Sequence, residues 1–573
     1  MFLFALTKGG IADNFHSVKF EECTLHSWKA TIVTDNFLSK YVSDAEGFSI
    51  IESPLINTSN DENNIFLRIS YSAKENRITV FKSTISGRPV YYHINSKGEF
   101  FCSSHISLLR TAGVLIEENT TVLPEFFVFR FVMPPNTLYK NIYQLFCGGI
   151  LNLSITKTKC TIKSTTMYQP PPHDTTVTSN KENAKKIYGL LTESLKQLTP
   201  RKAETIVLLS GGLDSSVLTK ISQSNSITNQ SYSTRYPFEN PQYDLEKEYS
   251  LSAAKALHVE HTFYEPSNQE YLIGFLEAIN TAEEPLHHLQ SVLFHLLFKK
   301  GVPKEKKLII HGQGAGTTFG SNDFLYIQNR LYFKFLLNST PLNIIQKTSK
   351  LSPRAKKLVT ILDKSIIKDN YQDPRNPLWS WMDFGSKQWA YNHFHISENE
   401  LIKDRYNFIK NLQNLSFYNI WALYSLFSDE QMTLSIWSKI GEGNKKILYF
   451  PYYDKTVLDY ALSIPWHIKL HKPLDDLRKK IATQAQIPKF IIKRKKSSLG
   501  IKTNQWAEKN GLFEPILPLV STVFDIQDIR KMQSNEPKHS MTYWNMLNYS
   551  IWKRLFINNE PLENLIEELE KTN

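Results

Sequence analysis

The chain has 573 residues, with 67 Lys and Arg against 55 Asp and Glu, which gives a formal net charge of +12. At about 100–200 residues per domain, this length predicts about two to four domains. A content of 41 % hydrophobic and 21 % charged residues excludes a disordered or fibrous chain. The basic charge leaves open a nucleic acid or an anionic small molecule as partner.

The beginning of the chain and its cysteines indicate the compartment. The opening MFLFALTKGG has no basic segment before its short apolar run, so we expect no secretory signal. The dense apolar run at residues 126–133 is interrupted by Arg130 and falls far short of the ~20 residues of a membrane span. The chain holds four scattered cysteines, Cys23, Cys102, Cys147 and Cys160. They form no CxxC pair, which favours reduced thiols in a cytoplasmic protein without a membrane partner.

Strand patterns dominate the first part of the chain. Residues 65–71 and 77–81 form two strand-like runs joined by a turn-prone connection. Residues 90–94 and 99–102 repeat this arrangement around a second turn. We therefore expect a β-rich domain here.

The best linker candidate contains three consecutive prolines at residues 170–172. Such a run continues neither a helix nor a central strand. We predict a β-rich domain over residues 1–168, a linker over residues 169–182 and a second domain over residues 183–573.

The second domain begins with an α/β pattern. Residues 183–198 carry apolar side chains at helical spacing, and residues 205–209 form a buried-type strand. Helical segments with short apolar strands follow, as in a layered α/β domain. From about residue 380 onward helical patterns predominate.

The most informative stretch is LLSGGLDSSVL at residues 208–218. A hydrophobic strand leads into a Ser-Gly-Gly turn, and a helix is predicted to begin near Ser215. The glycines permit a tight turn, and the exposed N–H groups at a helix start bind phosphate. The hydroxyls of Ser210, Ser215 and Ser216 add hydrogen bonds, and Asp214 can hold a magnesium ion. The P-loop pattern GxxxxGK[ST] does not occur.

The string SGGLDSS resembles the pyrophosphate-binding loop of the asparagine synthetase family and its ATP-pyrophosphatase relatives. These enzymes split ATP between the α and β phosphates, adenylate a carboxylate and let an amine displace AMP. Residues 231–234 are similar to the strand whose backbone frames the adenine, and residues 283–285 match an acidic-Pro element. The resemblance implies a doubly wound parallel sheet with a helical extension, and ATP and Mg²⁺ as cofactors.

The resemblance also assigns site residues. It implies nucleotide-binding positions at Leu209, Ser210, Gly211, Gly212, Asp214, Ser215, Ser216, Thr234, His311 and Gly312. Toward the C-terminus, residues 491–500 match an Arg-x-Lys segment whose lysine, here Lys496, stabilises the leaving pyrophosphate and the amide-forming transition state. The implied pyrophosphate-binding residues are Ser210, Gly212, Ser215, Ser216 and Lys496. Asp214 is the implied metal ligand, and Asp214 and Lys496 are the implied catalytic pair.

A second loop departs from the family. Residues 311–320, HGQGAGTTFG, are similar to its second nucleotide loop, Ser-Gly-Glu-Gly-x-Asp-Glu-x-Phe-Gly. Gln313, Gly316 and Thr317 stand where that pattern has acids, which weakens a divalent-metal site. The candidates to replace the lost charge are Asp323, Glu283 and Glu284.

The first domain resembles the glutaminase-type αββα sandwich of the same family, on residues 87–92 and 100–109. Glutamine hydrolysis there needs a cysteine at the mature N-terminus, as thiolate nucleophile with a free amine as base. This chain begins Met1-Phe2, and its first cysteine is Cys23. We expect a degenerate domain without glutaminase activity.

Without ammonia from glutamine, the amine is expected to come with the substrate. The β-lactam and carbapenam synthetases and the lasso-peptide cyclases are the branches that fit. The second loop and the aromatic-rich residues 320–430 favour a lasso cyclase, which adenylates an Asp or Glu of a core peptide and closes a macrolactam with its N-terminal amine. The expected partners are a precursor peptide and a leader peptidase.

Three alternatives remain open. One is a small-molecule ligase of the asparagine or β-lactam synthetase type, and another is a catalytically degenerate peptide-binding scaffold. An RNA-modifying ATP pyrophosphatase suits the basic charge, but no aromatic RNA-stacking motif stands out. We therefore expect no nucleic-acid partner.

Three histidines require a separate interpretation. His287, His288 and His295 are predicted on one helix, without the HExxH spacing of a zinc site. We interpret them as core residues.

Overall fold

The structure is a computed structural model of the chain. It describes residues 1–11, 19–25, 27–34, 39–44, 47–53, 65–174, 176, 179–237, 241–320, 384–412, 414–469, 476–494, 504–534 and 536–572. The predicted site residue Lys496 and the candidate acid Asp323 lie outside the described residues.

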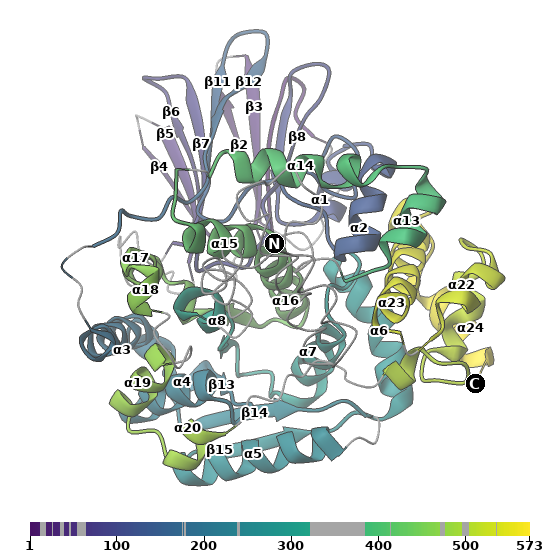
Figure 1. Ribbon diagram of the computed structural model, residues 1–573. Coiled ribbons are helices and arrows are strands. Elements are labelled where there is room, and N and C mark those ends of the chain that lie inside the picture. The colour runs from purple at the N-terminus through teal and green to yellow at the C-terminus, as the bar shows by residue number, and fades with distance from the viewer. Residues whose placement is uncertain are drawn as a thin grey trace, which may run out of the picture.

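Two antiparallel sheets form the N-terminal part, drawn at the top of Figure 1. The first has the order β10 (Tyr143–Gln144), β8 (Tyr91–Ile94), β9 (Phe100–Ser103), β1 (Phe2–Thr7), β3 (Trp28–Thr34) and β2 (Lys19–Leu25). The second has the order β12 (Cys160–Thr165), β11 (Ile150–Ile155), β7 (Arg77–Lys82), β6 (Leu67–Ser72), β5 (Gly47–Glu52) and β4 (Ser39–Asp44).

Alternation of side chains along the strands explains why these sheets pack face to face. In β6, β7 and β11, every second side chain is buried. The buried side chains of both sheets form one apolar core, to which Phe4, Trp28, Ile69 and Val80 belong. The result is the sandwich that the sequence predicts.

Two helices, α1 (Ile106–Thr111) and α2 (Leu123–Phe129), lie between β9 and β10 in the sequence, and α2 packs against helices of the second part. Every residue of α2 is buried, because the helix is embedded in the largest apolar core, which also contains the C-terminal helices. Asn545 Nδ2, for example, donates a hydrogen bond to the backbone oxygen of Phe127 at 2.8 Å.

A parallel sheet is the centre of the second part. Its order is β15 (Glu260–Tyr264), β14 (Gln230–Thr234), β13 (Thr205–Leu208), β16 (Leu308–Ile310) and β17 (Ile447–Tyr449). The strand order reverses between β13 and β16, and this is where ligands bind in doubly wound sheets.

Helices cover both faces of this sheet. The surrounding helices are α3 (Asn180–Lys196), α4 (Leu213–Ser224), α5 (Pro241–Leu257), α6 (Asn268–Ala282), α7 (Gln290–Leu296), α8 (Ala315–Phe319), α17 (Lys455–Ser463), α18 (Trp466–Lys469), α19 (Asp476–Gln484) and α20 (Lys489–Lys493). Ile187 of α3 and Val217 of α4 share one apolar core with Val207 of β13, while Phe275 of α6 and Val292 of α7 share another with Ile206. Neighbouring residues of β13 thus face opposite layers, as in an α/β sandwich.

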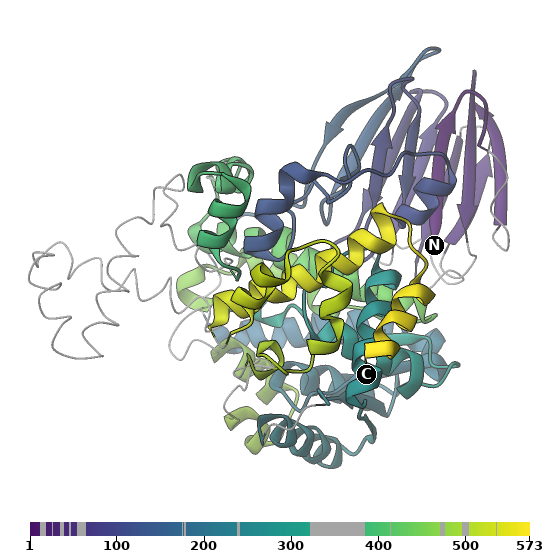
Figure 2. The ribbon, with the colours of Figure 1, turned by 90° about the vertical axis from the view of Figure 1, so that its right-hand side faces the viewer.

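Further helices come from two parts of the chain, one between β16 and β17 and one after α20. They are α13 (Lys387–Phe394), α14 (Glu398–Lys410), α15 (Phe417–Ser425), the π-helix η6 (Leu426–Glu430), α16 (Gln431–Gly443), α21 (Leu517–Val520), α22 (Ile526–Met532), α23 (Pro537–Trp552) and α24 (Leu562–Thr572). Figure 2 shows the yellow C-terminal helices below the sandwich, and α23 and α24 pack against α6.

The predicted fold class is confirmed, and the predicted strands agree with β6 to β9 within two residues. Helix α3 begins at Asn180, inside the segment predicted as linker, because Ser179 accepts a hydrogen bond from Glu182 N–H and caps it. The domain limits themselves stay a prediction. Among the described residues, no helix is long and apolar enough to span a membrane.

Candidate active site

The first loop joins β13 to α4 by the predicted turn, and α4 begins at Leu213, two residues before the predicted start near Ser215. Gly211 adopts a φ of +69°, and a Cβ atom there would lie 2.5 Å from the backbone oxygen of Tyr249. The position therefore requires glycine. The Ser210 backbone N–H donates to Ser215 Oγ at 3.2 Å, and the Gly212 N–H donates to Ser210 Oγ at 3.3 Å. These bonds hold the turn against the first turn of α4.

The phosphate-binding capacity of this loop comes from the helix that follows it. Helix α4 begins after Gly212. This glycine has no side chain that could cap the first N–H groups of the helix. The first N–H groups of a helix and its dipole attract anions. Ser216 Oγ is buried and has no hydrogen-bond partner among the described residues, and the same holds for Thr234 Oγ1 at the end of β14. Buried polar atoms without a partner are suited to bind a ligand, here a nucleotide that lies across the ends of β13 and β14.

Asp214 has a partner that sequence reasoning missed. Arg478 of α19 forms a bidentate ion pair with it, in which Nε donates to Oδ1 at 3.0 Å and Nη2 contacts Oδ2. Both carboxylate oxygens thus already hold a cation, so the described residues do not form a ready magnesium site. Tyr452 also fixes this residue, because its hydroxyl donates to the Asp214 backbone oxygen at 2.9 Å.

The second loop lies against the first one. A Cβ atom on Gly312 would lie 3.4 Å from the backbone nitrogen of Ser215, so the two backbones are in contact. The His311 ring packs against Phe294 and Trp437, and its Nδ1 accepts a hydrogen bond from the Gln313 N–H at 3.0 Å. The predicted nucleotide-binding residues at 209–216 and at Gly312 therefore lie close together, while the His311 side chain belongs to an aromatic cluster.

The acid that faces the second loop is Glu430, the last residue of η6. Gln313 Nε2 donates to both of its oxygens, at 3.1 and 3.0 Å, and Thr317 Oγ1 donates to Oε1 at 3.3 Å. Burial, together with the neighbouring charge of Asp429, raises the pKa of Glu430 to about 7. Two of the residues that replace the family's acids thus hold a buried acid from another helix.

The two acids suggested by the sequence do not take this place. The Glu283 carboxylate accepts hydrogen bonds from the Ile106 and Ser107 N–H groups at 2.7 and 3.2 Å and pairs with Lys439. Glu284 accepts a hydrogen bond from the Tyr91 hydroxyl. Both carboxylates therefore bind residues of the N-terminal part and do not face the second loop.

A further cation, Arg494, approaches the first loop. Its Nη1 donates to the Ser210 backbone oxygen at 3.3 Å, and the guanidinium lies 3.9 Å from the centre of the Tyr249 ring. Glu246 faces it at 3.8 Å. The start of the predicted basic segment is therefore at the loop, although Lys496 itself lies outside the described residues.

The cysteines whose side chains are described are not nucleophiles. Burial raises the pKa of Cys147 to about 11 and that of Cys160 to about 12, and it also raises the pKa of Cys102. The Cys147 thiol donates to the backbone oxygen of Thr84 at 3.3 Å. Buried thiols of this kind stay protonated and inert.

One prediction about the histidines is wrong. His287 and His288 lie in the turn before α7, and of the three only His295 is in the helix. Pro285 precedes the two histidines. A proline disfavours helical backbone at the residue before it, so α6 ends ahead of this turn.

Comparison with known proteins agrees with this geometry. The sequence profile described as Asparagine synthase matches residues 186–554, and that of the Glutamine amidotransferase domain matches residues 57–167. The glutamine-hydrolysing asparagine synthetase 1 of Bacillus subtilis is 20 % identical over 499 residues, which cover 82 % of this chain and 74 % of that protein. The chain is an ATP-dependent carbon–nitrogen ligase and belongs to the asparagine synthase family.

Proposed function

We propose that this ligase closes the macrolactam ring of a lasso peptide. It would adenylate an Asp or Glu side chain of a precursor core peptide and join it to the N-terminal amine of the same peptide. The observation that carries the ligase chemistry is the contact between the two glycine loops, at the point where the parallel sheet reverses its strand order.

The residues of the first loop would hold the polyphosphate of ATP. The N–H groups at the start of α4 face its negative charge, and the hydroxyls of Ser210, Ser215 and Ser216 donate to its oxygens. The substrate carboxylate attacks the α phosphorus, the bond between the α and β phosphates breaks, and pyrophosphate leaves. Arg494, and Lys496 by its position in the sequence, would stabilise that leaving group.

Magnesium enters this proposal only through ATP itself. Asp214 stays the predicted ligand, but its carboxylate is paired with Arg478. We derive no step through the metal. The amine nitrogen attacks the acyl carbon, the bond to the AMP oxygen breaks, and the amine gives up a proton.

The source of the amine supports a peptide substrate. Cys102, Cys147 and Cys160 are buried and protonated near neutral pH, so none of them supplies the thiolate that releases ammonia from glutamine. An amine on the substrate itself would react at high effective concentration. A leader peptidase would supply the free N-terminus, and the cytoplasm stays the predicted compartment.

The alternative with the best support is a small-molecule ligase of the asparagine or β-lactam synthetase type. The similarity to the Bacillus subtilis enzyme favours it. The replacement of the second-loop acids by Gln313, Gly316 and Thr317 speaks against an unchanged asparagine synthetase site.

The test uses the full chain with ATP, Mg²⁺ and three matched peptides. The first has a free N-terminus and a ring-forming acid, the second is acetylated, and the third has Asn or Gln in place of the acid. We expect pyrophosphate exchange into ATP with the first two, and loss of one water by mass spectrometry only with the first. Exchange with free aspartate but with no peptide would overturn the peptide assignment. The absence of both exchange and ATP binding would favour the scaffold.

A further inference from the structure

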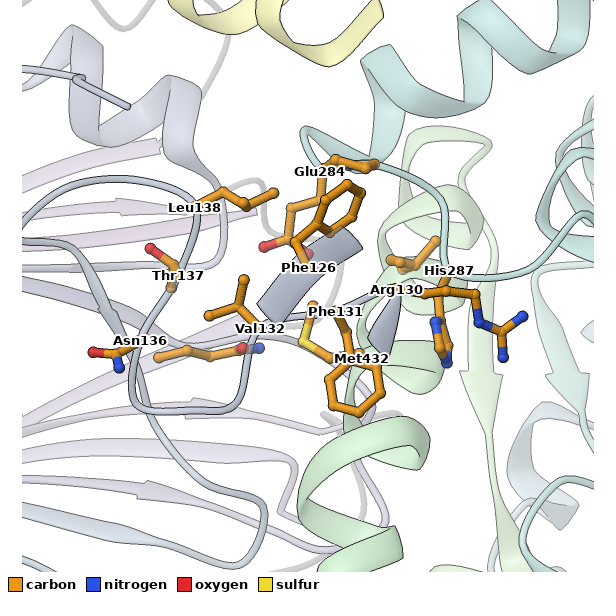
Figure 3. Close-up of a pocket in the computed structure, with 13 residues that line it drawn as sticks. Phe126, Arg130, Phe131, Val132, Asn136, Thr137, Leu138, Glu284, His287 and Met432 are labelled. Atoms are coloured by element: carbon orange, nitrogen blue, oxygen red, sulfur yellow. The ribbon is translucent and has the colours of Figure 1, made fainter. Parts of the chain in front are cut away.

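Outside the two loops, three metal-ligating side chains converge at one end of a small pocket between the N-terminal and C-terminal parts. His287 and His288 come from the turn before α7, and Asp429 comes from η6. One ligand atom from each can be chosen so that all lie within 4.8 Å of one another. We call these three residues the His287–His288–Asp429 cluster. Figure 3 shows His287 beside Arg130 at this end of the pocket.

One buried nitrogen of the cluster lacks a hydrogen-bond partner among the described residues. His287 is 1 % exposed, and its Nε2 lies 2.5 Å from Asp429 Oδ1. The backbone of Arg130 faces the His287 ring, but His287 Nδ1 has no partner in hydrogen-bonding geometry among the described residues. Buried polar groups without partners are costly, so a buried nitrogen in this state points to something bound.

The surroundings keep water away from one side of the cluster and leave another side open. The Phe131 ring packs edge-on against the His287 ring, with centroids 5.3 Å apart, and Trp437 lies 6.3 Å from the His288 ring. Asp429 is still 18 % exposed. An ion could therefore reach the cluster from the Asp429 side while aromatic rings shield the other.

We propose that the His287–His288–Asp429 cluster binds a divalent transition metal ion of the zinc class. Two imidazole nitrogens and one carboxylate oxygen suit Zn²⁺ and its neighbours, whereas Mg²⁺ prefers an all-oxygen set. Two ligand atoms with bonds of about 2.0–2.2 Å to one ion lie at most about 4.4 Å apart, so the three atoms, which lie within 4.8 Å of one another, would move closer together on binding. This site is separate from the Mg²⁺ that accompanies ATP.

Adjacent histidines can share one ion here because the turn is not helical. In a helix, consecutive side chains diverge by about a quarter turn or more, but the rings of His287 and His288 lie 4.3 Å apart.

The nearest competing cation is Arg130. Its Nη2 lies 3.9 Å from Asp429 Oδ1, and its guanidinium stacks 3.6 Å from the centre of the Phe384 ring. That distance exceeds a direct hydrogen bond, so Arg130 Nη2 does not bind this carboxylate oxygen directly.

The bound ion would join two segments that are distant in sequence. Asp429 precedes Glu430, which accepts hydrogen bonds from Gln313 and Thr317 of the second loop. The ion would fix η6 to the turn before α7 and so hold Glu430 in place. A π-helix inserted between α15 and α16 at this point is the kind of irregularity found at functional sites.

The test measures metal content and affinity on the full chain, without ATP or peptide, so its outcome does not depend on the proposed ligase activity. The protein is stripped with a chelator, given Zn²⁺ or Co²⁺, and titrated against a chromophoric chelator. We expect one Zn²⁺ per chain, and a Co²⁺ absorption band typical of nitrogen and oxygen ligation.

His288→Gln and Asp429→Asn should each weaken Zn²⁺ binding more than about tenfold, since even outer-shell partners contribute that much. His295→Gln is the matched control, because His295 pairs with Glu277 outside the cluster, and it should bind Zn²⁺ like the wild type. Circular dichroism verifies that each variant is folded. His288 is only partly buried, so His288→Gln disturbs the core least. Substoichiometric binding by the wild type, or equal affinity in His288→Gln, would overturn the proposal.

Discussion

Lys439→Met should destabilise the protein strongly, because it leaves a buried carboxylate without its cation. Lys439 is fully buried and Glu283 is 6 % exposed, with Nζ and Oε2 3.1 Å apart. Glu283 also binds the first N–H groups of α1, so the pair joins the N-terminal sandwich to α16. Removing one partner of a buried ion pair costs about 3–5 kcal/mol.

The pH dependence of this pair follows from Glu283. Burial alone would raise its pKa, but the charges of Lys439 and His105 and the backbone donors outweigh burial and lower the pKa to about 2. A carboxyl group whose pKa is lowered by folding stabilises the fold at pH values above its pKa in the unfolded chain, which is about 4.5. This contribution is lost as the pH falls toward 2. The shift corresponds to about 3 kcal/mol in the wild type at neutral pH.

The assay is urea unfolding followed by tryptophan fluorescence, at pH 7 and near pH 3. Lys439→Met should lose about 3–5 kcal/mol at pH 7, and less near pH 3, where the unpaired Glu283 is protonated. The double variant Glu283→Gln/Lys439→Met should recover most of the loss, because no buried charge is left. A single variant within about 0.5 kcal/mol of the wild type, or a double variant no better than the single one, would refute the reasoning.

Three further predictions concern the first loop. Gly211→Ala should abolish ATP binding, because its Cβ would overlap the Tyr249 backbone. Gly189→Ala in α3, where a Cβ meets nothing within 4 Å, is the matched control, and both are measured by nucleotide titration. Asp214→Asn should lower pyrophosphate exchange, because it removes the carboxylate that joins the first loop to Arg478; a fully active variant would remove Asp214 from the catalytic assignment. Arg494→Gln should weaken product inhibition by pyrophosphate about 10–100-fold, as expected for a lost charge-assisted hydrogen bond. The exposed Lys493→Gln should leave that inhibition unchanged, and equal inhibition of both variants would contradict the role of Arg494.

Local features could be predicted from the sequence. The strand, the Ser-Gly-Gly turn and the start of α4 follow from residues 205–216 alone, because a positive φ and a helix start have short-range signals. The alternating strands of the N-terminal sandwich are local in the same sense.

Long-range pairings could not be predicted. Arg478 and Asp214 are 264 residues apart, and Glu430 and Gln313 are 117 residues apart. Nothing in the local pattern of 426–430 indicates a π-helix, and its packing against the second loop depends on the whole core. The helix predicted over His287 and His288 is a turn in the structure, because Pro285 disfavours helix just ahead of these residues.

The most direct test of the central claim is the identity of the nucleotide product. The full chain is incubated with ATP, Mg²⁺ and the free-amine peptide, and the nucleotides are separated by ion-exchange chromatography. The two-loop site predicts AMP and pyrophosphate, in a one-to-one ratio with the peptide that has lost one water. Formation of ADP and phosphate, or ring closure without consumption of ATP, would contradict it.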